Sequence, residues 1–386
     1  MPFLSETEAL PCAKVSPENL RHLADTHHAS LVLYSEQRLL HSYRQLRDHL
    51  PAVKLFFALK PLPLPQVVAA LDADGACFDI ASSGELDLLR PAQVAAERIF
   101  YSNPIKFPFD IAQVYAYGVR TFVVDNLDEL SKLEPYRADC AIMLRVAFPN
   151  EEAVVRLSDK FGLPYDDALA TLEVITARGF RVQGISFHVG SRMQAPHEFV
   201  AAIERCGDLF AAARLALGLE LQVLNIGGGF PDFTCETPYS IAEFCAPVNA
   251  ALAARFAGVA VFAEPGRSIV NSCVSVVTRV IGKAERNGRL WYYLNDGVYS
   301  SFSGCIFDGR QATFEVLDTL FDRPARPTVL AGPTCDSVDV MRTDLHLPEL
   351  EIGDLLLSRC MGAYTIASAT GFNLIKPPVF IAVDAA

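Results

Sequence analysis

Short apolar runs recur through the first two thirds of the chain. They are apolar at nearly every position, which is typical of strands buried on both faces of a parallel sheet. The runs are Val53–Ala58, Ala76–Ala81, Arg98–Ser102, Thr121–Asp125, Ala141–Val146, Val182–His188, Leu221–Ile226 and Val259–Ala263.

The stretches between these runs have the spacing and end signals of helices. Pro65–Leu71 begins with proline, and Asn126 is followed three residues later by Glu129, as at a capped helix start. Asp166–Arg178 and Glu198–Leu217 are longer amphipathic stretches. Eight strand–helix units in roughly 220 residues predict a (β/α)8 barrel, with a doubly wound sheet as the alternative of equal periodicity.

Polar or glycine-rich positions come at or near the end of every run, and they favour the barrel. A barrel enzyme gathers such groups at the carboxyl ends of its strands. In chain order they are Lys60, Asp79, Asn103, Asp125, Arg145, His188, Gly227-Gly228-Gly229 and Glu264-Pro265-Gly266-Arg267.

The pattern changes after about residue 270, where β-rich or alternating segments are separated by turns. This predicts an antiparallel sandwich or barrel domain. A short helix is expected from Ser16-Pro17. We expect residues 28–272 to form the barrel, and residues 1–27 with 273–386 to form the β-sandwich domain. The segments are Val274–Ile281, Leu290–Leu294, Thr313–Val316, Thr328–Leu330, Asp354–Leu357 and Val379–Val383.

Composition excludes several classes of protein. Of the 386 residues, 51% are hydrophobic and 20% are charged, which excludes a disordered chain. The net charge of −12 argues against nucleic acid and anionic membrane as partners. No apolar run is long enough for a membrane span, and no secretory signal is visible. The ten cysteines form no CxxC pair, so we expect reduced thiols, a cytoplasmic protein and no metal site.

Lys60 and the glycine run are the first candidates for chemistry. A lysine at the end of an apolar strand can be an amine nucleophile for a carbonyl, or a surface lysine that extends to water. Three glycines after a strand let backbone N–H groups approach a phosphate, or form a tight turn. The run lacks the spacing of a P-loop or a dinucleotide fingerprint.

Glu264 and His188 complete the candidate set. Glu264 stands close to Arg267, as a phosphate-binding pair or as an ion pair in a loop. His188, before Gly190-Ser191, is catalytic or structural, while Asn103, Asp125 and Glu85 are interpreted as structural. An amine, a phosphate cradle, a carboxylate and an imidazole together fit pyridoxal 5′-phosphate.

The motifs resemble those of the fold type III (alanine racemase-like) pyridoxal-phosphate decarboxylases, in the ornithine decarboxylase group. They occur in the family's order and cover nearly the whole chain. The matching stretches are Phe78–Ser82, Phe187–Ser191, Gly227–Pro231, Glu264–Arg267, Asn295–Tyr299, Gly332–Ser337 and Met361–Thr365.

The resemblance implies a role for each matching residue. Lys60 would form the internal aldimine, His188 would stack on the cofactor ring and Glu264 would keep the pyridine nitrogen protonated. Cys335, from the other subunit of a head-to-tail homodimer, would protonate the α-carbon after CO2 leaves. The other implied cofactor contacts are Asp79, Arg145, Ser191, Gly228, Gly229, Arg267 and Tyr364, and the implied substrate contacts are Asp308, Asp336 and Phe372.

The resemblance implies decarboxylation of a basic L-amino acid, first of all ornithine to putrescine and also lysine to cadaverine, in polyamine biosynthesis. Two aspartates suit a distal ammonium group. The family usually has a small residue and asparagine after its lysine, whereas this chain has Pro61-Leu62-Pro63, and Phe307 replaces the usual tyrosine. A larger diamino-acid conjugate of siderophore or antibiotic assembly is therefore an alternative substrate, and an inactive regulatory relative is a second alternative.

Overall fold

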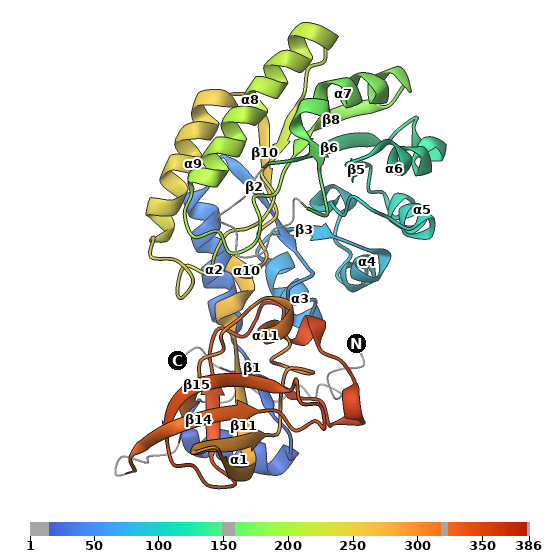
Figure 1. The fold of residues 1–386 in the computed structure, drawn as a ribbon. Coiled ribbons are helices and arrows are strands. Elements are labelled where there is room, and N and C mark those ends of the chain that lie inside the picture. Colours follow the sequence, from blue (N-terminus) through green and yellow to red (C-terminus); the bar gives the residue numbers. More distant parts are fainter. Residues whose placement is uncertain (1–14, 149–158, 318–322, 384–386) are drawn as a thin grey trace. The chain divides into compact units, whose positions relative to one another are not determined.

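The computed structural model describes residues 15–148, 159–317 and 323–383, and within it the chain divides into two compact units. One unit comprises residues 42–269, and the other comprises residues 1–41 together with 270–386. Each unit contains its own sheet (Figure 1).

Eight parallel strands of the first unit close into a barrel. Their order is β5-β4-β3-β2-β10-β9-β8-β6, and pairing of β5 with β6 closes the ring. All eight predicted runs are strands, with ends within two residues of those predicted, so the barrel is confirmed over the doubly wound sheet. The strands are β2 (Val53–Ala58), β3 (Cys77–Ile80), β4 (Ile99–Tyr101), β5 (Thr121–Val124), β6 (Ala141–Ala147), β8 (Arg181–Ser186), β9 (Val223–Asn225) and β10 (Ala260–Ala263).

Helices surround the strands (Figure 1), and the short strand β7 (Leu163–Pro164) pairs with β6 outside the ring. Asn126 caps α6 as predicted, since its side chain accepts the N–H of Glu129 at 2.9 Å. The helices are α2 (Glu36–His49), α3 (Pro65–Ala73), α4 (Ser83–Leu89), α5 (Pro108–Tyr117), α6 (Leu127–Lys132), α7 (Ala168–Ala177), α8 (His197–Leu217), α9 (Ile241–Arg255) and α10 (Arg267–Val270).

The second unit contains a mixed sheet of order β13-β16-β11-β12-β14-β15, to which β1 and β17 are added. The prediction of a purely antiparallel domain was wrong in two pairings, because β1 runs parallel to β17 and β12 runs parallel to β14. Its elements are α1 (Pro17–His27), β1 (Leu31–Tyr34), β11 (Val274–Arg286), β12 (Arg289–Leu294), α11 (Gly304–Phe307), β13 (Glu315–Val316), β14 (Ala325–Ala331), β15 (Val340–Pro348), β16 (Leu355–Ser358) and β17 (Val379–Ala382).

Strand β1 explains why the units divide at residue 42 rather than at the predicted residue 28. All four of its residues are buried, and it pairs antiparallel with β11 and parallel with β17. Leu31 and Leu33 join the core formed by Val277, Leu357 and Ile381. Burial on both faces of a sheet therefore groups residues 28–41 with the second unit.

The described helices include none with the length and apolar character needed to cross a membrane. The nine described cysteines are all free thiols, and Cys12 lies outside the described residues.

Candidate active site

Lys60 follows β2 and lies between the ends of two neighbouring strands. The N–H of Ala58 donates to the carbonyl of Pro265, and the N–H of Leu59 donates to the carbonyl of Asp79, both at 3.1 Å. These bonds fix the backbone directly before the predicted nucleophile. The Lys60 side chain is exposed in the single chain, and its charge acts on the buried groups described next.

Asp79 and Glu264 are buried carboxylates that feel the charge of Lys60. Burial raises the pKa of Asp79 well above its usual value, and Glu264 raises it further, whereas Lys60 opposes the shift. Burial also raises the pKa of Glu264, against the cations Lys60 and Arg145. Burial in turn lowers the pKa of Arg145, against the charge of Glu264. The buried site formed by Asp79, Glu264 and Arg145 can therefore accept one more cationic group beside Glu264.

Asn225 orients Glu264, and the sequence analysis missed this residue. Its Nδ2 donates to Oε1 of Glu264 at 2.6 Å, and its Oδ1 accepts the N–H of Gly227 at 2.9 Å. The N–H of Glu264 donates to the carbonyl of Gly227 at 2.7 Å. An asparagine two residues before a glycine run, at the end of an apolar strand, was the available signal.

The glycine run is a tight turn because its neighbours leave no room for a side chain. Gly227 and Gly229 have φ values of +66° and +106°. A Cβ on either would lie 2.1 or 2.3 Å from a carbonyl oxygen of the loop after β8, and a Cβ on Gly228 would lie 2.7 Å from the carbonyl oxygen of Glu264. The turn therefore joins the loops after β8, β9 and β10, as the phosphate interpretation also needs.

His188 presents a neutral imidazole to this turn. Its Nδ1 accepts the N–H of Gly190 at 3.0 Å, which places the ring proton on Nε2. Burial lowers the pKa of His188 well below its usual value, and the charges of Arg145 and Lys60 lower it further. A neutral aromatic ring suits stacking against a planar group better than it suits acid catalysis.

Arg267 is nearly buried and shares a carboxylate with a second arginine. Its Nη1 lies 3.4 Å from Oε1 of Glu236, and Nε of Arg192 lies 3.3 Å from the same oxygen. Arg192 directly follows Ser191, the predicted phosphate contact. Neither Arg192 nor Glu236 was recognised from the sequence, because only the fold brings them to Arg267.

In the second unit, Tyr299 contacts two predicted substrate-binding residues, and Asn373 contacts the predicted proton donor. Tyr299 donates its hydroxyl hydrogen bond to Asp336 and stacks on Phe372, with ring centroids 4.4 Å apart. Both the N–H and the Sγ of Cys335 donate to Oδ1 of Asn373, at 3.3 and 3.5 Å. The Tyr299 hydroxyl holds the pKa of Asp336 below its usual value, so this carboxylate is an anion at neutral pH.

Asp308 and Tyr364 also lie in the second unit. Asp308 is buried at the end of α11, and Tyr364 has a left-handed backbone with φ of +54°. The other predicted cofactor contacts belong to the barrel unit.

Comparison with known proteins shows the family to which the chain belongs. Residues 36–271 match the family described as "Pyridoxal-dependent decarboxylase, pyridoxal binding domain". The chain belongs to this family.

Three similar proteins match most of this chain. The lysine/ornithine decarboxylase of Selenomonas ruminantium is 33% identical over 361 residues, which cover 93% of this chain and 91% of that protein. The crystal structure of the lysine/ornithine decarboxylase of Vibrio vulnificus complexed with putrescine has a TM-score of 0.88, 41% identity and coverage of 95% and 99%. Antizyme inhibitor 2 of Xenopus laevis is 36% identical over 340 residues, with coverage of 84% and 74%.

The barrel residues fit the cofactor of this family, pyridoxal 5′-phosphate. A protonated pyridine nitrogen is the cation that Glu264, buried against a single amide donor, can accept. The glycine turn and the nearly buried Arg267 suit a phosphate, and the neutral His188 suits the ring. The chain thus carries the pyridoxal-binding half of a decarboxylase.

Proposed function

We propose that the protein decarboxylates L-ornithine to putrescine, and L-lysine to cadaverine, in polyamine biosynthesis. The observation that carries the proposal is the anionic Asp336 directly after Cys335, because a carboxylate at this place suits a distal ammonium. The likeness to a lysine/ornithine decarboxylase complexed with putrescine supports the same choice.

Each predicted residue receives one task in this proposal. When bound, pyridoxal phosphate supplies an electron sink for the pair released as CO2 leaves. Lys60 holds the cofactor covalently, Glu264 keeps the pyridine nitrogen protonated, and His188 covers the ring. Ser191, Gly228, Gly229, Arg267 and Tyr364 hold the phosphate, while Asp79 and Arg145 support Lys60.

Cys335, Asp336, Asp308 and Phe372 face the substrate in the proposal. We infer that Cys335 and Asp336 act in the barrel site of a partner subunit, so that the functional form is a homodimer with shared sites. The exposed thiol of Cys335 and the Asp336 carboxylate are then placed to give a proton and to hold the distal ammonium. We also place the enzyme in the cytoplasm, in keeping with the nine free cysteines among the described residues.

A second candidate function is decarboxylation of a larger diamino-acid conjugate. The Pro61-Leu62-Pro63 segment after Lys60 and the replacement of tyrosine by Phe307 favour it. The likeness to antizyme inhibitor 2 raises a third, an inactive regulatory protein, against which Lys60, the glycine turn and Cys335 argue.

A substrate screen tests the proposal. Purified protein with pyridoxal phosphate would be assayed for CO2 release from ornithine, lysine, arginine, diaminopimelate and 2,4-diaminobutyrate. We expect ornithine and lysine to have the highest kcat/KM. Release from none of them, despite bound cofactor, would favour the conjugate, and absence of visible cofactor absorbance would favour the inactive relative.

We expect Asp336→Ala to raise KM for ornithine with a smaller change in kcat. The lost charge-assisted hydrogen bond is worth about 1.5–3 kcal/mol, or roughly ten- to a hundredfold in KM. Steady-state kinetics would measure it, with Asp344→Ala as the control, since that carboxylate pairs with Arg342 on an exposed strand. An unchanged KM would place the distal ammonium elsewhere.

We expect Cys335→Ala to release CO2 but to protonate the wrong carbon. Without the thiol, a proton reaches the cofactor side, and the products become an aldehyde and pyridoxamine phosphate. Chromatography of both products against the parent enzyme would measure the partition, with the exposed Cys235→Ala as the control. Clean diamine from Cys335→Ala would remove this thiol from the proton-donor role.

A further inference from the structure

The segment after β4 inverts the usual pattern of burial. Ile105, Phe107 and Phe109 are 48%, 67% and 57% exposed, whereas Lys106 between them is 2% exposed. A buried ammonium costs free energy, and apolar replacements of buried ions often stabilise a protein. Burial of the lysine in place of its apolar neighbours therefore calls for a reason other than stability.

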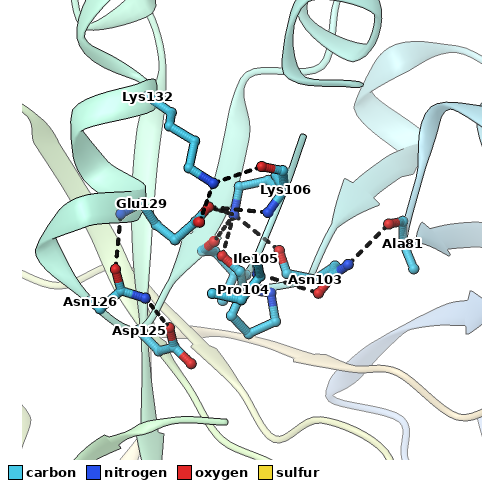
Figure 2. Close-up of polar contacts among 10 residues, drawn as sticks. Ala81, Asn103, Pro104, Ile105, Lys106, Asp125, Asn126, Glu129 and Lys132 are labelled. Atoms are coloured by element: carbon cyan, nitrogen blue, oxygen red, sulfur yellow. Dashed lines mark hydrogen bonds and ion pairs between the residues drawn. The ribbon is translucent and has the colours of Figure 1, made fainter. Parts of the chain in front are cut away.

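Lys106 binds three backbone carbonyls at once (Figure 2). Its Nζ donates to the carbonyl oxygens of Asn103, Pro104 and Val123, at 3.0, 2.8 and 2.5 Å. Three acceptors match the three N–H groups of an ammonium. Glu129 Oε2 lies 3.9 Å from the same nitrogen. The bonds join the segment after β4 to the end of β5.

The backbone of residue 106 is held by α6 as well. Its N–H donates to Oε2 of Glu129 at 3.1 Å, and its carbonyl accepts Nζ of Lys132 at 2.8 Å. Lys132 also pairs with Glu129 (Figure 2). Burial, with a smaller contribution from Lys132, lowers the pKa of Lys106 to about 7 against the raising effect of Glu129 and Asp125. These charges, with the ring of Tyr101 at 5.8 Å, surround the ammonium.

The start of the segment, at Ser102, reaches the buried carboxylate Asp79. The N–H of Ser102 donates to Oδ1 of Asp79 at 3.2 Å. Hydrogen bonding by Ser102 lowers the pKa of Asp79 and of Glu264, against the larger effect of burial on both. Asn103, the next residue, donates its Nδ2 to the carbonyl of Ala81 at 3.2 Å. The backbone N–H of Ser102 thus bonds to one of the two carboxylates that feel the charge of Lys60.

We propose that Ser102 and Lys106 are positioning residues: Lys106 fixes the segment after β4, and Ser102 thereby holds Asp79 in place beside the nucleophile Lys60. Neither residue needs to touch the substrate. The inference rests on the proposed function, because it concerns the charge that Lys60 and the cofactor meet.

The test compares Ser102→Ala, Lys106→Met and the double variant with the parent enzyme carrying its cofactor. Ser102→Ala keeps the backbone N–H that binds Asp79 and removes the hydroxyl, whose hydrogen bonding lowers the pKa of both carboxylates, so Lys60 then holds its proton less strongly. We expect the pH midpoint of the cofactor's visible absorbance to fall by about 0.5–1 pH unit in each single variant. We expect kcat to fall roughly tenfold or more. Since both residues act through one contact, the double variant should equal the larger single effect.

Glu129→Gln and Lys54→Met complete the design. Glu129→Gln removes the anion beside the ammonium at constant shape, and it should shift the midpoint in the same direction if Lys106→Met does not fold. Lys54→Met changes an exposed lysine of β2 and should leave the midpoint unchanged. Midpoints equal to the parent's, or a lower melting temperature alone, would overturn the inference. A parent enzyme without visible absorbance would instead contradict the proposed function.

Discussion

Lys60→Ala is expected to abolish both the visible absorbance of the bound cofactor and all measurable decarboxylation. The amine lies where the backbone bonds of Ala58 and Leu59 tie β2 to the segments that carry Glu264 and Asp79. No other lysine is expected at this position, because Lys106 and Lys132 are held by their own partners in the described structure. Absorbance spectra and CO2 release would be measured on protein saturated with pyridoxal phosphate.

Lys54→Ala is the matched control for this experiment. Lys54 lies in β2, the strand before Lys60, with its ammonium over the ring of Phe56, and its loss should leave spectrum and rate unchanged. Turnover of ornithine by Lys60→Ala at near the parent rate would show that another group carries the cofactor.

Glu264→Gln should lower kcat by about a hundred- to a thousandfold while cofactor binding persists. Glutamine keeps the size of the side chain and can still accept the hydrogen bond from Nδ2 of Asn225. It lacks the negative charge that keeps a pyridine nitrogen protonated, and loss of a preorganised electrostatic partner in a closed site has this magnitude. Single-turnover CO2 release would isolate the chemical step.

The control for Glu264→Gln is Glu243→Gln. Glu243 caps the exposed start of α9 with Ser240, so its change should affect stability slightly and kcat not at all. Equal rates for Glu264→Gln and the parent enzyme would mean that the ring nitrogen is held by another group.

Most of the barrel could be predicted from its strands. Buried parallel strands are apolar at nearly every position, so local composition marks them, and all eight were located. Strand β1, Leu31–Tyr34, was missed although it is buried at all four positions like the barrel strands. β15, at Val340–Pro348, was missed because its charged residues and exposed edge resemble a loop.

The residues that face the cofactor could be proposed from their positions at strand ends. The residues that orient these cofactor contacts could not be proposed from the sequence. Asn225, Glu236, Tyr299 and Asn373 act through bonds to residues far away in the chain, at separations that no local pattern records. At Lys106 burial runs against side-chain polarity, since the lysine is buried while Ile105 and Phe107 on either side of it are exposed.

By itself, the amino-acid sequence determined the barrel strands, the order of the motifs and the types of group available for chemistry, because these follow from local composition and spacing. Only the tertiary structure decided which carboxylates are buried and which amide orients Glu264. It also decided that Lys106 holds the segment from which Ser102 bonds to Asp79. Burial and hydrogen-bond partners depend on contacts between distant segments, and those contacts exist only once the strands have closed.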